Sequence, residues 1–181
     1  MKIIFLTMLI FSCNNNNIEH YKVLKPKLSK SVLNQNNTLN DELIWDAPTN
    51  WKQKNTTSSI RLEEFDIAYT DGMGDLSVVK LSSDGGGLEA NINRWRGQLN
   101  LDPISLEQIN ASSFIGIASV GNFQWFEIID KNNINAILAA IIPFKNFTYF
   151  VKLNATKKGT DEIKADFIDF CSSFKAIEKN N

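Results

Sequence analysis

The chain has 181 residues, with 19 Lys and Arg against 20 Asp and Glu, a formal net charge of −1, and 43% hydrophobic residues. This length suits one globular domain with appendages, and the hydrophobic content excludes both a wholly disordered chain and a polytopic membrane protein. The near-neutral balance excludes a strongly basic face, so we expect no nucleic-acid partner. One His and two Cys leave little for the usual catalytic and metal-site chemistries. We therefore expect neither enzyme activity nor a cofactor or metal, although a single sequence can conceal an unfamiliar active site.

The N-terminus carries the pattern of a secretion signal. Lys2 is followed by the apolar run Ile3–Phe11 and then by Ser12 and Cys13. A basic start, a short apolar stretch and a small residue before a cleavage point are typical of such signals. The run is too short to cross a bilayer, which takes about 20 residues. Its end, Leu9–Cys13, resembles the lipobox of bacterial lipoproteins, and this resemblance implies that residues 1–12 are removed and that Cys13 is lipidated.

That resemblance places the protein in the bacterial cell envelope, held to the membrane by its N-terminal lipid on the periplasmic side. Asn14 follows Cys13 directly and is not the Asp associated with retention at the inner membrane, which favours the outer membrane. The stretch up to residue 41 is rich in Asn and Lys and has few spaced apolar residues, so residues 13–41 are predicted to form a flexible tether. Residues 42–181 are predicted to form a single globular domain.

The first half of this domain predicts an aromatic opening segment, a hairpin and two helices. The segment contains Trp45, Pro48 and Trp51, and the hairpin joins strands 59–68 and 76–82 through a turn at Asp71–Asp75. A helix is predicted from a stripe spaced four, three and four residues apart, as one buried face requires: Leu88, Ile92, Trp95 and Leu99. A second, short helix is predicted at 105–110, where Ser105 and Gln108 fit a capping box.

The second half predicts four strands and a closing helix. The strands span residues 114–120, 123–129, 136–142 and 147–153, and the third is apolar on both faces, as a covered central strand would be. Thr160 is predicted to cap the closing helix, whose stripe again has a spacing of four, three and four: Ile163, Phe167, Phe170 and Phe174. Helices that flank a predominantly antiparallel sheet make an α+β sandwich.

This order of elements resembles the PsbP-like α/β/α sandwich. Local motifs are similar to those of a group of uncharacterised bacterial secreted proteins and lipoproteins. They are W-x-x-P-x-x-W at Trp45–Trp51, the pair Ile60-Arg61, and N-x-N-R-W-R-G-Q at Asn91–Gln98. This resemblance implies a fold and a location but brings no catalytic residue.

One constellation has the chemistry of a binding site. Gly85, Gly86 and Gly87 open a helix, where free backbone N–H groups favour an anion. On that helix Asn91, Arg94 and Gln98 fall at i, i+3 and i+7 and could bind a carboxylate, a phosphate or a partner's backbone, with Arg96 nearby. The alternative interpretation is structural: Asn91, Asn93 and Arg94 bond to neighbouring loops and fix the helix to the sheet.

Two hypotheses about function follow. The first is a lipid-anchored envelope domain that binds or assists a protein partner without catalysis. The alternative is a lipoprotein that binds a small molecule or anion through Gly85–Gly87, Asn91, Arg94 and Gln98.

Overall fold

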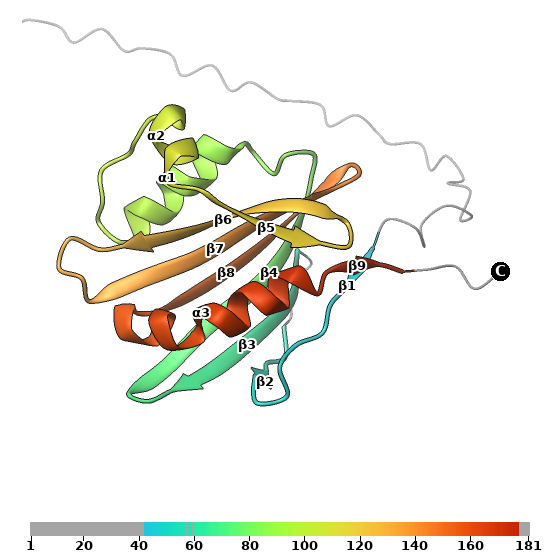
Figure 1. Cartoon of the computed structure of the whole chain (residues 1–181), viewed down its shortest axis with the longest axis horizontal. Coiled ribbons are helices and arrows are strands. Elements are labelled where there is room, and N and C mark those ends of the chain that lie inside the picture. The colour runs from blue at the N-terminus through green and yellow to red at the C-terminus, as the bar shows by residue number, and fades with distance from the viewer. Residues whose placement is uncertain (1–41, 57, 59, 178–181) are drawn as a thin grey trace, which may run out of the picture. The chain divides into compact units, whose positions relative to one another are not determined.

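A seven-stranded sheet lies at the centre of the domain, and every pair of neighbouring strands in it is antiparallel (Figure 1). The computed structural model describes residues 42–177 apart from 57 and 59, so the predicted signal, Cys13 and the tether lie outside the described residues. The strand order is β2-β3-β4-β8-β7-β6-β5. In chain order the strands are β2 (Lys52–Gln53), β3 (Arg61–Tyr69), β4 (Gly72–Ser82), β5 (Phe114–Ala118), β6 (Gly121–Ile129), β7 (Asn135–Phe144) and β8 (Phe147–Thr156).

Helices cover both faces of this sheet. Helix α3 (Lys157–Ser172) lies on one face, and α1 (Leu88–Gln98) and α2 (Leu106–Ala111) lie on the other (Figure 1). The α+β sandwich that the sequence predicts is therefore confirmed. Within the described part of the chain, no helix is long and apolar enough to span a membrane.

The core under α3 is aromatic, and the opening segment completes it. Trp45 stacks on Phe174 with ring centroids 4.7 Å apart, and Trp51 lies 5.1 Å from Phe170. The four predicted stripe residues of the closing helix are all buried there: Ile163, Phe167, Phe170 and Phe174. A small two-stranded sheet, β1 (Leu43–Ile44) paired with β9 (Lys175–Ala176), joins the two ends of the domain. The sequence analysis did not predict this pairing.

The second core lies under α1 and α2. Ile92 and Trp95 of α1 and Ile109 of α2 are buried against the sheet, as the spacing predicts. The predicted capping box of α2 is present: the Ser105 hydroxyl accepts from the Gln108 N–H at 3.3 Å, and the Gln108 side chain accepts from the Ser105 N–H at 3.0 Å. Reciprocal capping lets so short a helix begin at a defined residue.

Helix α3 begins one turn before the predicted cap. The prediction of Thr160 as the cap is wrong, because the Thr156 hydroxyl accepts from the Gly159 N–H at 3.0 Å and Thr160 is buried inside the helix. A glycine such as Gly159 commonly interrupts a helix. Here Gly159 lies within α3, and packing explains the residue type, since a Cβ at this position would lie 2.6 Å from ring atoms of Tyr69.

Strand β4 also begins earlier than predicted, at Gly72, so the turn assigned to Asp71–Asp75 is too long. The two glycines that suggested a turn lie within the strand. A Cβ at Gly72 would lie 2.6 Å from the Tyr69 hydroxyl, and one at Gly74 would lie 2.9 Å from Leu153 Cδ1. Close packing, which glycine allows in a strand, therefore explains both positions.

Candidate functional site

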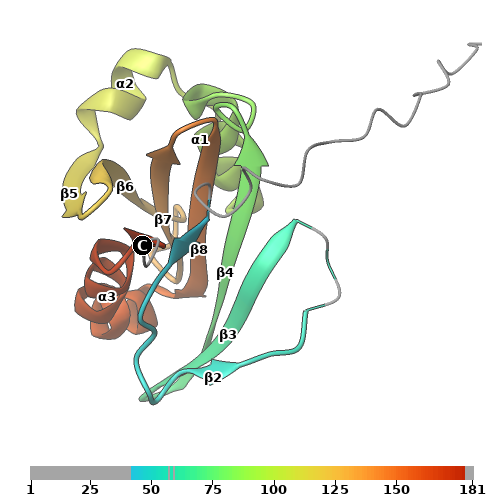
Figure 2. The same cartoon turned by 90° about the vertical axis from the view of Figure 1, so that its right-hand side faces the viewer.

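Helices α1 and α2 cover only part of their face of the sheet. Their buried side chains pack on β6, β7 and β8 through Phe126, Ile128, Ile137, Ala139 and Phe150. Strands β3 and β4 extend beyond them, and among the residues that the structure describes no helix lies over this part of the face (Figure 2). In a sandwich a sheet face normally buries its side chains against a second layer, so the composition of the uncovered part is informative.

Strand register shows which side chains share this face. Cross-strand partners lie on the same side of a sheet, and three rows end under α1 and α2. The rows are Arg61–Val79–Phe150–Ile141, Glu64–Ser77–Lys152–Ala139–Phe126 and Asp66–Asp75–Asn154–Ile137–Ile128. Each row is apolar under the helices and mostly polar beyond them. We call the polar part the open half of the sheet: Arg61, Glu64, Asp66, Asp75, Ser77, Lys152 and Asn154.

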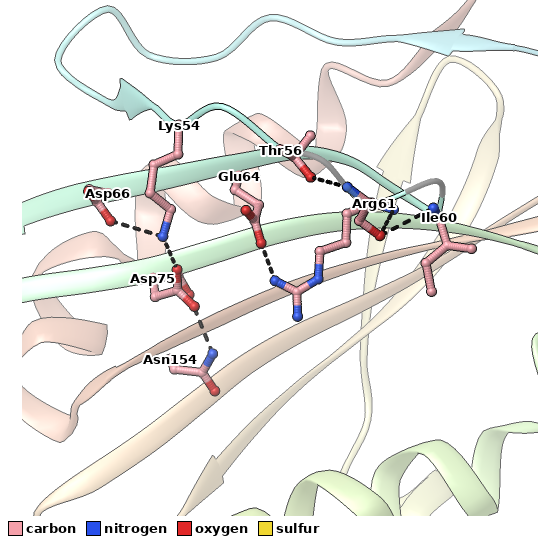
Figure 3. Close-up of polar contacts among 9 residues, drawn as sticks. Lys54, Thr56, Ile60, Arg61, Glu64, Asp66, Asp75 and Asn154 are labelled. Carbon is pink, nitrogen blue, oxygen red and sulfur yellow. Dashed lines mark hydrogen bonds and ion pairs between the residues drawn. The ribbon is translucent and has the colours of Figure 1, made fainter.

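Ion pairs organise the outer part of the open half (Figure 3). Lys54, which follows β2, places its Nζ 2.5 Å from Asp75 Oδ1 and 3.1 Å from Asp66 Oδ1. The hydrogen bond to Asp75, and then that to Asp66, raises the pKa of Lys54. Arg61 donates to the Glu64 carboxylate. Such partly exposed pairs contribute little stability, so this arrangement is not needed to hold the fold.

Lys152 has a different environment from these ion-paired side chains. It is half-buried on β8, beside α1, and its Nζ donates to Gln98 Oε1 at 2.9 Å. Burial lowers the pKa of Lys152, and the charges of Arg61 and Arg94 lower it further against an opposing effect of Asp75. Its ammonium is therefore partly desolvated and lies within electrostatic reach of two other cations.

The N–H groups of the three glycines before α1 form hydrogen bonds within their own loop. They donate to the Ser82 carbonyl, to Asp84 Oδ1 and to the Asp84 carbonyl. All three glycines have positive φ, which explains the residue type. Asn91 belongs to the same network: its side-chain amide, 1% exposed, donates to the carbonyls of Gly85 and Gly87 at 3.1 and 2.7 Å.

The other predicted site residues separate into two groups. Arg94 and Gln98 are exposed at the edge of α1 that borders the open half, where Gln98 meets Lys152. Arg94 also donates to Asn91 Oδ1. Arg96 instead donates to the Asp102 carbonyl at 2.9 Å, and Asn93 exchanges two 2.9 Å bonds with the backbone of Ile104. The structure thus brings Arg94 and Gln98 to one surface and engages Gly85–Gly87, Asn91, Asn93 and Arg96 in local contacts.

Sequence reasoning missed the strand side of this surface. In β3 a signal was available, because charged Glu64 and Asp66 alternate with buried Phe65 and Ile67. In β8 Lys152 lies between the apolar residues Val151 and Leu153, and only the strand register places it beside Ser77 and in one row with Glu64.

The other features of the described residues do not add a catalytic set. A hollow of about 310 Å³ on the α3 face is lined by eight residues, including Trp45, Glu63, Lys80 and Tyr149, and by no predicted site residue. No group of three or more His, Cys, Asp or Glu side chains in the described part of the chain could hold a metal ion. Cys171 is fully buried, and burial raises the pKa of its thiol well above the usual value.

No protein-family model and no curated protein sequence matches this chain. Similar solved structures include a Bacteroides thetaiotaomicron protein at 10% identity and a TM-score of 0.44, covering 77% of this chain and 46% of that one. The chain thus spans about half the length of that protein. Cyanobacterial PsbP (CyanoP) from Synechocystis is 12% identical with a TM-score of 0.47, over 79% and 96% of the two chains. LpqN, involved in cell envelope biogenesis of Mycobacterium tuberculosis, is 11% identical with a TM-score of 0.44, over 75% and 83%. All three similarities have a TM-score below 0.5 and an identity of 12% or less.

Proposed function

We propose that this protein is a lipid-anchored, non-enzymatic binding domain of the cell envelope, attached through Cys13, and that it recognises its partner with the open half of the sheet. One observation carries the proposal: within residues 42–177, no helix covers the open half of the sheet, and this surface carries charged side chains in ordered rows. Ser77, between Glu64 and Lys152 in the middle row, is only 6% exposed, so the side chains around it pack closely and are not freely solvated.

The chemistry of the open half suits recognition by charge and hydrogen bonding. It presents fixed cations and carboxylates a strand spacing apart, and its ion pairs keep the side chains in place before a partner arrives. Such complementarity sets specificity and association rate more than total affinity. A tether between Cys13 and the domain would let this surface reach a partner away from the lipid.

The test is capture of the tagged, full-length lipoprotein from gently solubilised membranes. We expect a stoichiometric partner that survives moderate salt and is lost with the double variant Asp66→Asn, Asp75→Asn. The matched control is Asp102→Asn, which removes one carboxylate from an exposed ion pair with Lys131 outside the open half. Capture that is equal for both variants contradicts the assignment of the surface, and so does no capture at all. Turnover by the purified protein that one side-chain change abolishes would overturn the non-enzymatic part.

The anion-binding alternative has support from part of its residue set. Arg94 and Gln98 border the open half, whereas the amides of Gly85–Gly87 and the side chain of Asn91 donate within the loop. As a second candidate function, a small anion would thus meet the far end of α1 rather than its N-terminus.

A further inference from the structure

Two cations at the border of the open half are held by neutral amides. Lys152 donates to Gln98 Oε1, and Arg94 donates to Asn91 Oδ1. Six other lysines of the domain pair with carboxylates: Lys54, Lys131, Lys157, Lys158, Lys164 and Lys175. Within the residues that the structure describes, no carboxylate forms an ion pair with Lys152 or Arg94. A neutral amide orients a cation without placing a negative charge in contact with it.

Lys152 and Arg94 both lie along α1, where their hydrogen bonds are to Gln98 and to Asn91, two turns apart. Arg94 and Gln98 are four residues apart on α1 and therefore neighbours on its surface, and Lys152 reaches Gln98 from β8. Arg61, two strands away on the adjacent row, adds a third positive charge, although Glu64 pairs with it. Burial is the main cause of the lowered pKa of Lys152, and the charges of Arg61 and Arg94 lower it further against the opposing charge of Asp75.

We infer that Lys152, Arg94 and Gln98 bind an oxyanion, a carboxylate or phosphate group of a small soluble ligand, at the junction of α1 and β8. An oxyanion there would receive charge-assisted hydrogen bonds from the ammonium and the guanidinium, and the Gln98 side-chain N–H₂ is a further donor. Because Lys152 is half-buried, its attraction to an anion is screened less than that of a fully exposed lysine. This inference rests on the proposed function, because the site borders the open half.

The experiment uses the full chain in detergent, titrated with inorganic phosphate and, separately, with acetate, each against sodium chloride at equal ionic strength. We expect the melting temperature to rise with the logarithm of the concentration of at least one oxyanion and not with chloride. The arm that responds identifies phosphate or carboxylate as the group. Loss of a hydrogen bond to a charged partner weakens binding by about tenfold or more, so Lys152→Met should abolish the response over the same range.

Controls separate binding from folding. Lys131→Met removes an exposed lysine elsewhere and should respond like the wild type. Arg94→Gln is a second variant: it removes the guanidinium together with its hydrogen bond to Asn91 Oδ1, and the oxyanion response should weaken, whereas a response equal to that of the wild type would exclude Arg94 from the site. No shift beyond chloride, or an equal shift in Lys152→Met and the wild type, overturns the inference. If partner capture still depends on Asp66 and Asp75 in that case, the oxyanion site alone is wrong; if capture also fails to depend on them, the proposed function is wrong as well.

Discussion

Asn91→Ala should destabilise the domain strongly, although Arg94 and Gln98 on the same side of α1 are exposed. The side-chain amide makes two hydrogen bonds to the glycine loop and is almost fully buried. Each bond contributes about 1 kcal/mol net, and leaving a carbonyl of the loop without its donor costs roughly 1 kcal/mol more. The expected loss is therefore about 3 kcal/mol. For roughly 140 ordered residues, with an unfolding entropy of about 2.1 cal/mol/K per residue, this corresponds to about 10 °C in Tm.

Urea unfolding followed by tryptophan fluorescence measures this loss, with thermal melting as a second readout. The midpoint should fall while the slope with urea stays constant, since the substitution changes little of the surface exposed on unfolding. Asn110→Ala, at an exposed asparagine of α2, is the matched control and should stay within about 0.5 kcal/mol of the wild type. A loss below about 1 kcal/mol for Asn91→Ala would refute the reasoning, because the loop carbonyls would then be satisfied without Asn91.

Three further predictions concern other parts of the fold. Gly159→Ala should destabilise the domain by about 1–3 kcal/mol in a thermal melt, because the clash of a Cβ 2.6 Å from the Tyr69 ring outweighs the gain in helix propensity. Gly97→Ala has open space around its Cβ and should stabilise the domain by up to about 1 kcal/mol. Stability changes of the same sign in the two variants would contradict this prediction. Backbone N–H donors, that of Ile134 first, lower the pKa of Asp130 in the folded state, so its stabilising effect is full above the unfolded pKa and is lost as pH falls through the folded one. The difference in urea midpoint between wild type and Asp130→Ala should thus be present at neutral pH and shrink in acid, and a difference that grows in acid would oppose the assignment. In a Cys13→Ser chain, Cys171 should resist a thiol reagent until denaturant is added, since its thiol is buried and its pKa is raised; rapid labelling of the folded protein would show otherwise.

Much of the fold could be predicted because its elements carry local signals. The buried stripes of α1 and α3 have the spacing of a helix, and β7 is apolar on both faces because α3 covers one and α1 and α2 the other. The β1–β9 pairing could not be predicted in the same way. Leu43 and Ala176 are partners from opposite ends of the domain, and strands of two residues leave no periodicity to detect.

Glycines lie at two of the boundaries where prediction and structure differ, and the physical reason for these glycines cannot be seen in a sequence. Gly72, Gly74 and Gly159 have no Cβ because Tyr69 and Leu153 occupy that space, and these contacts exist only after the hairpin and α3 have packed. The sequence does not distinguish a glycine that avoids a tertiary clash from a glycine that ends a strand or helix. The turn predicted at Asp71–Asp75 is therefore too long, because Gly72 and Gly74 belong to β4.

Asn91, Arg94 and Gln98 of α1 show why the sequence alone cannot separate residues that hold a loop from residues that could bind a ligand. Asn91, Arg94 and Gln98 lie along one face, yet the glycine loop closes over the first turn and the open half begins at the last. Asn91 is thus buried by its own loop, while Gln98, two turns on, reaches Lys152. The structural interpretation was made for Asn91, Asn93 and Arg94, and the bonds of Asn91 and Asn93 to loop backbone agree with it. Binding through Arg94 and Gln98 remains a proposal. We expect Lys152→Met to abolish the oxyanion response and Asn91→Ala to lower stability. These results together would place loop stabilisation at the first turn of α1 and ligand binding at its last turn. Closure of the glycine loop at one end would then fix the position of the proposed site at the other.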